Sequence, residues 1–157
     1  MSWIRNTIVG VSGVGIVSAG VLGFDATVRN DSGEIVESGA LGVFSMQVGD
    51  CINDIDFGAS EISEGLGVPC SEPHVYEVYY ETFLEGLELE SIKQMADEEC
   101  QSGFESYVGV PFKESALYYS VLFPSPESYD EGDREITCLL VTEDGSKLTG
   151  SMRGSGY

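Results

Sequence analysis

Positive charge is scarce in this chain, which has seven Lys and Arg against 27 Asp and Glu and a formal net charge of −20 over 157 residues. Contact with nucleic-acid phosphates needs clustered Lys and Arg, so the composition argues against a nucleic-acid partner. The same deficit argues against docking on an anionic lipid surface. The length suits one domain of roughly 100–150 residues and excludes a large multidomain enzyme.

Histidine is represented by His74 alone, which leaves little material for acid–base chemistry. Ser71 and Glu72 are close to it in sequence, but acyl transfer also needs an ordered base and an oxyanion hole. No nucleophile elbow surrounds these residues. We interpret His74 as a structural residue and keep His74 with Glu72 as a candidate surface site for a ligand. The sequence therefore predicts no catalytic residues, no enzymatic activity, no cofactor and no metal centre.

No acidic residue occurs before position 25, so all 27 acids belong to the rest of the chain. We interpret them as a solvated surface, or as a surface that steers a basic or redox protein partner. Loose binding of Ca²⁺ is a further reading. A defined calcium loop is not expected, because Asp54 and Asp56 have suitable spacing but Phe57 stands where the turn needs glycine.

The four cysteines contain no CxxC pair, which argues against a thioredoxin-like motif and a zinc site. An even number of cysteines outside the membrane is typical of disulfides, and three connectivities are open to four residues. Sequential pairing, Cys51–Cys70 and Cys100–Cys138, closes the shorter loops and is the pairing we predict. Each bridge contributes roughly 2–4 kcal/mol by restricting the unfolded chain.

The first 24 residues contain one charge, Arg5, and an uncharged run of 19 residues over positions 6–24. As a helix this run would nearly match the hydrocarbon thickness of a bilayer. We predict a single-pass anchor in the plasma membrane, with a secretory signal peptide cleaved after Val17-Ser18-Ala19 as the alternative. No cysteine follows the run closely enough for lipid attachment. Arg5 before the run and Asp25 after it place the N-terminus in the cytoplasm and the C-terminal domain outside.

Three small residues of this run recur every fourth position, namely Gly15, Ala19 and Gly23. They share one helix face, and such a face lets two membrane helices approach closely. We predict that it contacts a helix of an integral membrane protein complex. The alternative is that Gly and Ser are simply common in membrane spans.

Periodicity predicts an α+β domain, in which a small, mainly antiparallel sheet is covered by one long helix. The helix is expected over residues 88–101, with Gly103 as its stop. Cys100 would join this helix to the strand that carries Cys138. Strands are expected at residues 43–51, 74–83, 116–123, 135–142 and 148–152.

Three regions follow from this reading. Residues 1–24 form a cytoplasmic tip and transmembrane anchor, residues 25–45 a tether or small hairpin, and residues 46–157 an extracytoplasmic, disulfide-bonded domain. Within the domain, residues 53–67 read as an exposed loop and residues 124–132 as a turn or short helix.

Several short motifs in the C-terminal part occur together in a fixed order, and they comprise residues 48–51 (VGDC), 68–74 (VPCSEPH), 77–78 (EV), 132–134 (GDR), 138–140 (CLL), 144–145 (DG) and 148–154 (LTGSMRG). Together they resemble the septum-formation domain family of actinobacterial envelope proteins, over about residues 48–154. The resemblance implies an exported, disulfide-bearing domain behind one membrane span, and it implies no enzymatic activity. Tyr129 stands where the family usually has Trp before the GDR motif.

The anchor, the small-residue face and the lack of catalytic motifs predict a non-catalytic accessory subunit of a larger membrane complex. Its acidic domain would cap that complex on the outer face, at a division septum or on an actinobacterial respiratory supercomplex. The alternative is an envelope enzyme or ligand-binding receptor centred on His74.

Overall fold

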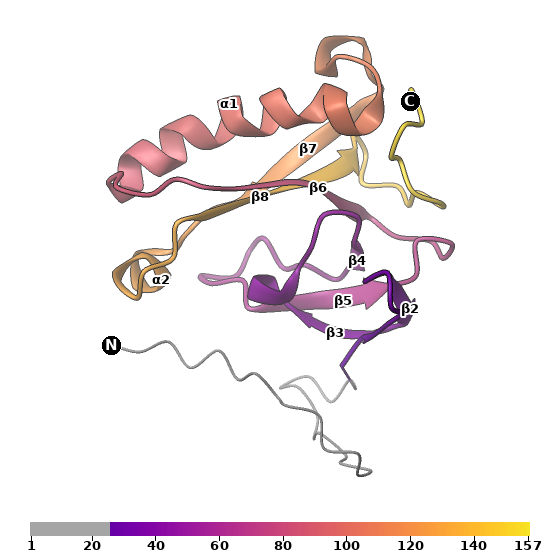
Figure 1. Ribbon diagram of the computed structural model, residues 1–157, viewed down its shortest axis with the longest axis horizontal. Coiled ribbons are helices and arrows are strands. Elements are labelled where there is room, and N and C mark those ends of the chain that lie inside the picture. Colours follow the sequence, from indigo (N-terminus) through magenta and orange to yellow (C-terminus); the bar gives the residue numbers. More distant parts are fainter. Residues whose placement is uncertain (1–25) are drawn as a thin grey trace.

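The computed structural model describes residues 26–157 (Figure 1). The predicted anchor at residues 1–24, with its face of Gly15, Ala19 and Gly23, lies outside the described residues. Across residues 26–157, no helix is both long and apolar enough to span a bilayer.

One antiparallel sheet of six strands forms the body of the domain, in the order β3-β5-β4-β6-β8-β7. Figure 1 shows the helix α1 on one side of the long strands β6, β7 and β8, and the shorter strands on the other side. The predicted α+β class and the mainly antiparallel sheet are confirmed. The strands are β3 (Gly39–Gly42), β4 (Cys51–Asn53), β5 (Glu64–Val68), β6 (Tyr76–Phe83), β7 (Leu117–Leu122) and β8 (Glu135–Thr142).

The long helix α1 (Leu89–Val108) covers the three long strands, as predicted. It extends past Gly103, so the predicted stop is wrong. Gly103 packs directly on the ring of Tyr80, and a Cβ at this position would lie 2.9 Å from Tyr80 Cβ and overlap the ring. Glycine is therefore required for contact with the sheet, and the helix ends instead at Gly109, whose φ of 97° is left-handed.

Both disulfides have the predicted sequential pairing, Cys51–Cys70 and Cys100–Cys138. Cys100 on α1 and Cys138 on β8 are fully buried, so this bridge ties the helix to the strand between β6 and β7. The first bridge connects the start of β4 to the residues that follow β5.

The remaining elements are short. Residues 26–37 contain the hairpin of β1 (Val28–Arg29) and β2 (Ile35–Glu37), whereas β3, within the predicted tether or hairpin at 25–45, belongs to the six-stranded sheet. The helix α2 (Pro126–Asp130) begins after Ser125, whose hydroxyl accepts a hydrogen bond from the Ser128 amide. Two 3₁₀ turns, η1 (Val43–Ser45) and η2 (Phe112–Glu114), complete the described chain.

Three expected elements differ from the structure. Residues 43–51 are not a strand, because the chain turns at η1 and again at Gly49, where φ is 102°. The expected loop at 53–67 contains β5, which bonds β3 on one side and β4 on the other despite its two glycines. Residues 148–152 form only an isolated bridge, between His74 and Leu148, before the chain turns toward Glu77.

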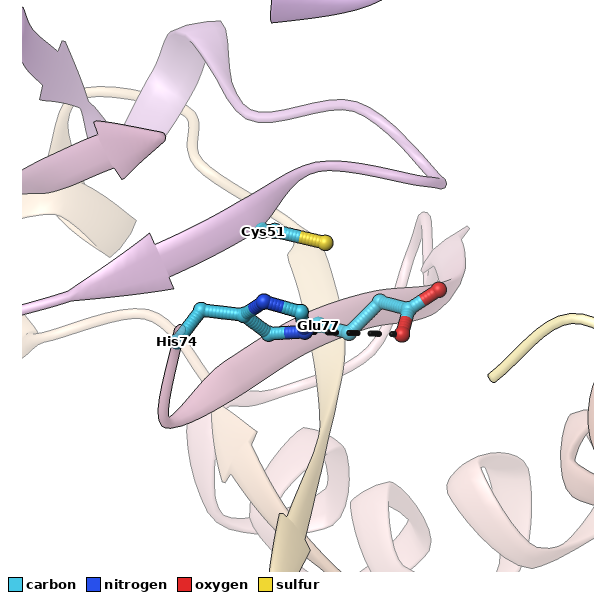
Figure 2. A group of neighbouring side chains, drawn as sticks. All are labelled: Cys51, His74 and Glu77. Atoms are coloured by element: carbon cyan, nitrogen blue, oxygen red, sulfur yellow. Dashed lines mark ion pairs between the residues drawn. The ribbon is translucent and has the colours of Figure 1, made fainter. Parts of the chain in front are cut away.

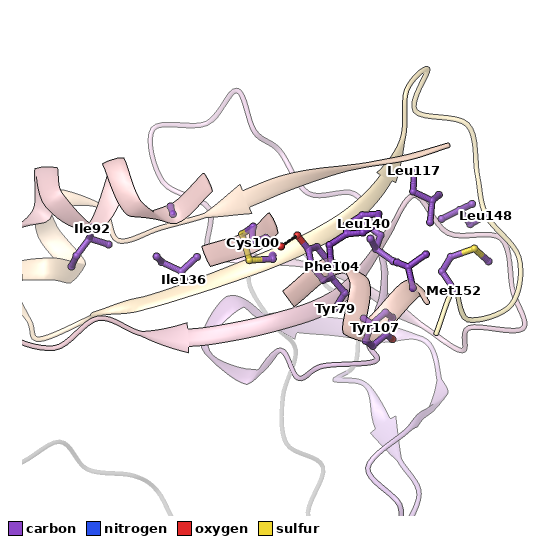
Figure 3. Close-up of a cluster of buried hydrophobic side chains, with 13 residues drawn as sticks. Tyr79, Ile92, Cys100, Phe104, Tyr107, Leu117, Ile136, Leu140, Leu148 and Met152 are labelled. Carbon is purple, nitrogen blue, oxygen red and sulfur yellow. Dashed lines mark hydrogen bonds between the residues drawn. A yellow bond between two sulfur atoms is a disulfide. The ribbon is translucent and has the colours of Figure 1, made fainter. Parts of the chain in front are cut away.

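Hydrophobic side chains pack on both faces of the sheet. The larger cluster lies between α1 and the long strands and includes Tyr79, Phe104 and Leu140 (Figure 3). The smaller cluster covers the opposite face, where Val78 and Leu139 meet residues of β2, β3 and β4. The sheet therefore curls over itself, and β6 is buried on both sides at Val78 and Tyr79.

Candidate functional site

The single histidine lies just before β6, where the curled sheet is most deeply buried. His74 has no solvent exposure. Its Nδ1 is 2.8 Å from the carbonyl oxygen of Glu72, and because a carbonyl can only accept, Nδ1 carries the proton in this bond. Its backbone pairs with Leu148 in both directions. The ring is thus anchored by one hydrogen bond through Nδ1, and the backbone that carries it is fixed by Leu148.

Glu77, the second residue of β6, is a fully buried carboxylate. It accepts hydrogen bonds from the Tyr107 hydroxyl (2.7 Å), the Ser151 hydroxyl (2.6 Å) and the Met152 amide (2.8 Å). These donors offset part of the free energy that the carboxylate loses when it is removed from water. This carboxylate therefore joins β6, the end of α1 and the C-terminal segment at one point.

His74 and Glu77 face each other inside this cluster, as Figure 2 shows. His74 Nε2 is 3.9 Å from Glu77 Oε2, beyond hydrogen-bond length, and within residues 26–157 it has no hydrogen-bond partner. The sulfur of Cys51 is a third potential metal ligand, and the ligand atoms of Cys51, His74 and Glu77 all lie within 4.8 Å of one another. The Cys51 sulfur is bonded to Cys70, so no thiolate is present to hold a metal ion beside the imidazole and the carboxylate.

Tyr107 connects this cluster to the surface. Burial, and then the hydrogen bond to Glu77, raise the pKa of the Tyr107 phenol, so it remains a donor at physiological pH. Its ring faces the guanidinium of Arg153 at 4.5 Å, and its carbonyl accepts a hydrogen bond from the Gly154 amide. The last residues of the chain are thereby packed against the end of α1.

A cavity of about 740 Å³ lies beside the cluster and is lined partly by the Cys51–Cys70 disulfide. Asp50 closes one side of it. This buried aspartate accepts two hydrogen bonds from the Arg29 guanidinium, at 2.6 and 2.7 Å, and one from the Gln47 amide. His74 does not line the cavity. A molecule in this cavity would touch the disulfide and Ser151 without reaching the imidazole.

The structure places the two residues of the predicted surface site differently. His74 is buried, whereas the Glu72 side chain is exposed and lies 3.4 Å from the Ser38 hydroxyl. Only the Glu72 backbone carbonyl contacts the imidazole. Thus the structure does not form the His74–Glu72 side-chain site that the sequence suggested.

Sequence reasoning missed the hydrogen-bond partners of Glu77, the carboxylate that faces His74. Tyr107 is 30 positions from Glu77 in the sequence, and Ser151 is 74 positions from it. No local pattern connects these residues. One signal was present: several motifs that carry the family resemblance, those with Asp50, Cys51, His74, Glu77 and Ser151, all meet around this cluster. We infer that these motifs encode a buried polar joint and the bridge beside it.

Comparison with known proteins gives one family match. A family described as "Septum formation" matches residues 48–155. A Mycobacterium tuberculosis protein named "Putative lipoprotein LppN" is 30% identical over 113 residues, which cover 69% of this chain and 63% of that protein. Its Mycobacterium bovis counterpart of the same name is 31% identical over 115 residues, with the same coverage. The chain therefore spans less than two thirds of the length of these relatives. No solved structure matches.

Proposed function

Because this chain belongs to the septum-formation family, we propose that it is a non-catalytic accessory protein of the bacterial envelope. Its disulfide-bonded domain lies outside the cytoplasm and binds the outer face of an integral membrane protein complex. The observation that carries the proposal is the large surplus of acidic side chains over free bases on the surface of the domain.

Most described bases are already engaged within the chain. Arg29 forms a bidentate pair with Asp50, and Lys93 pairs with Glu90 at 3.1 Å. Arg134 donates to two backbone carbonyls and lies 3.6 Å from the Tyr129 ring centroid. Internal pairing thus leaves most of the acidic surface unneutralised. A partner with a basic outer face would be attracted over a distance of about one Debye length, roughly 8–10 Å at physiological ionic strength.

The position of His74 favours this function over an enzyme or receptor centred on that residue. A general base must come within hydrogen-bond reach of its substrate. His74 has no exposed surface and is not part of the cavity wall. The cluster around it instead resembles a structural joint that holds the C-terminal segment in place.

Two disulfides support an extracytoplasmic location, because such bridges persist in oxidising compartments. The mycobacterial relatives carry the word lipoprotein in their names. In this sequence all four cysteines are in disulfides, so none is left to carry a lipid. We therefore assign membrane attachment to residues 1–24, with Gly15, Ala19 and Gly23 facing a helix of the partner complex.

Co-purification tests the proposal directly. The full chain, tagged after Tyr157, is isolated from its host in a mild uncharged detergent after brief cross-linking. We expect one or more integral membrane proteins to accompany it in fixed ratio and to be released as ionic strength rises. The identity of these proteins decides between a septal and a respiratory host. Isolation of the chain alone would refute the accessory role.

Two variants separate the accessory function from its alternative. Replacing Gly15 and Ala19 by Leu should reduce co-purification, because the larger side chains block close helix contact. His74→Asn should leave the cell's phenotype intact wherever the domain still folds, as judged by intact disulfides and circular dichroism. A folded His74→Asn protein that loses function would favour the enzyme or receptor.

A further inference from the structure

A second hollow, of about 630 Å³, opens on the side of the domain away from His74. One wall is the loop between β4 and β5, including Phe57 and Glu61, together with Phe44 of η1. The other wall is the segment from the end of β7 through α2. The first residues of β8 contribute the floor. We call this hollow the phenylalanine groove.

Large apolar side chains are unusually exposed along the groove. Phe44, Phe57 and Phe123 have 69%, 42% and 49% of their surface accessible. The three come from separate segments of the chain, and within residues 26–157 only Phe57 among them has an aromatic neighbour, the ring of Tyr76 at 5.5 Å. Exposing these rings to water is unfavourable in free energy, and another chain packed against them would remove that penalty. The grouping of three phenyl rings around one hollow therefore indicates a place where another chain packs.

Carboxylates accompany these rings. Five acids line the groove, and Lys93 is the one base among its lining residues. Lys93 is also already paired with Glu90. The acids are Glu61, Glu127, Glu131, Asp133 and Glu135.

Negative charge is concentrated at the floor of the groove. Burial, and then the charge of Asp133, raise the pKa of Glu135 above its ordinary value. Glu81 on β6 lies opposite Thr137, a lining residue, and so shares its face of the sheet. Glu81 Oε1 is sealed from solvent without a hydrogen-bond partner in the described part of the chain. An incoming Lys or Arg side chain would bring the opposite charge to Glu135 and to the other carboxylates that line the groove.

We propose that the phenylalanine groove binds a basic, amphipathic segment of the partner protein, with apolar side chains against the three phenyl rings and Lys or Arg against the carboxylates. This inference rests on the accessory role proposed above and names the surface that performs it. Charge complementarity selects the occupant. A second copy of this chain would bring its own acids toward the groove, and an anionic membrane would be repelled by it.

A peptide titration tests the groove with the full chain in uncharged detergent. The probe is a labelled peptide of about twelve residues with alternating Lys and Leu, long enough to fill such a groove. Two comparison peptides replace every Lys by Glu or every Leu by Ser. Fluorescence anisotropy gives the affinity of each. We expect the Lys–Leu peptide to bind at least about tenfold more tightly than either comparison peptide, since charge and apolar contact both contribute.

Two pairs of substitutions locate the binding. Phe44→Ser with Phe57→Ser should weaken binding of the Lys–Leu peptide by about tenfold. The matched control is Tyr118→Ser with Tyr157→Ser, two exposed aromatic residues that do not line the groove. Glu127→Gln with Glu131→Gln should weaken binding of the same peptide by about threefold to tenfold at low salt. The control for charge is Glu98→Gln with Glu105→Gln, two exposed acids on α1.

The outcomes are decisive for the groove. If either control weakens binding as much as its groove variant, or if the Lys–Ser peptide binds as well as the Lys–Leu peptide, the attraction is general and the proposal is wrong. Co-purification separates this failure from that of the accessory role. A partner retained by the groove variants would contradict the groove alone, whereas peptide binding without any co-purified partner would contradict the accessory role alone.

Discussion

Replacing Glu77 by Gln is the sharpest test of the buried polar joint. The amide is nearly the same size as the carboxylate, so the change alters hydrogen bonding more than volume. Glu77 accepts three hydrogen bonds in the native protein, from Tyr107, Ser151 and Met152. A glutamine side chain has one acceptor oxygen and places an NH₂ donor where an oxygen stood, so at least one native donor loses its acceptor.

The magnitude follows from the number and kind of these bonds. A hydrogen bond to a charged group contributes about 1.5–3 kcal/mol, and a buried donor left without an acceptor costs about 1–3 kcal/mol. Allowing for partial rearrangement of the flexible Ser151 hydroxyl, we expect Glu77→Gln to lower the free energy of unfolding by about 2–4 kcal/mol. Tyr107→Phe, which removes one donor and leaves the carboxylate, should cost about half as much.

Urea unfolding measures the loss, and hydrogen exchange shows where it acts. The Gly154 and Gly156 amides bond to the last turn of α1, next to Tyr107. Their exchange should accelerate in Glu77→Gln before that of the amides in β8. The matched control is Glu98→Gln on the exposed face of α1, which should change stability by less than about 0.5 kcal/mol. A Glu77→Gln protein as stable as this control, with unchanged protection near residue 154, would refute the reasoning.

Two further predictions concern positions where the structure reverses an ordinary expectation. Gly103→Ala should destabilise the protein by about 1–2 kcal/mol in urea unfolding, although alanine is the better helix former, because the new Cβ overlaps Tyr80. In a Tyr80→Ala background the same change should become neutral or stabilising, and an unchanged sign there would contradict the steric explanation. Burial, then the charges of Glu135 and Asp50, raise the pKa of Glu81 from 4.5 to about 7. The native state therefore binds the proton more tightly than the unfolded state, so this group makes stability fall as pH rises from about 4.5 to 7. Glu81→Gln should remove that slope and exceed the wild type by about 1 kcal/mol at pH 8, once solvent screening is allowed for, as measured by urea titration at several pH values. An equal difference between the two proteins at pH 4.5 and pH 8 would show that Glu81 does not titrate in this way.

Local sequence patterns predicted the elements whose own residues show a clear hydrophobic pattern. The β8 strand is continuous in β-branched and apolar residues, and the spacing of Ile92, Ala96 and Cys100 marks the buried face of α1. Loop length favoured the sequential disulfides, and the short motifs were enough for the family. The count of acids and bases by itself determined that any partner of this surface has to tolerate or complement a strong negative charge.

Tertiary contacts decided the rest. Gly103 reads as a helix stop in sequence, and only the Tyr80 ring packed on it explains why the helix continues. The glycine-containing strand β5 has weak propensity, yet it forms because β3 and β4 supply hydrogen bonds on both sides. The phenylalanine groove likewise gathers side chains from elements far apart in the chain.

The candidate site shows the same division most clearly. The sequence by itself determined that His74 is the single histidine available to the site, because residue identity limits the chemistry. Only the tertiary structure decided that His74 is sealed away from Glu72's side chain and placed against Glu77. A buried carboxylate takes whichever donors the folded chain brings within about 3 Å, and the donors of Glu77 come from residues 30, 74 and 75 positions away. No local pattern can encode such a meeting, because it exists only once the sheet has curled and the C-terminal segment has returned across it.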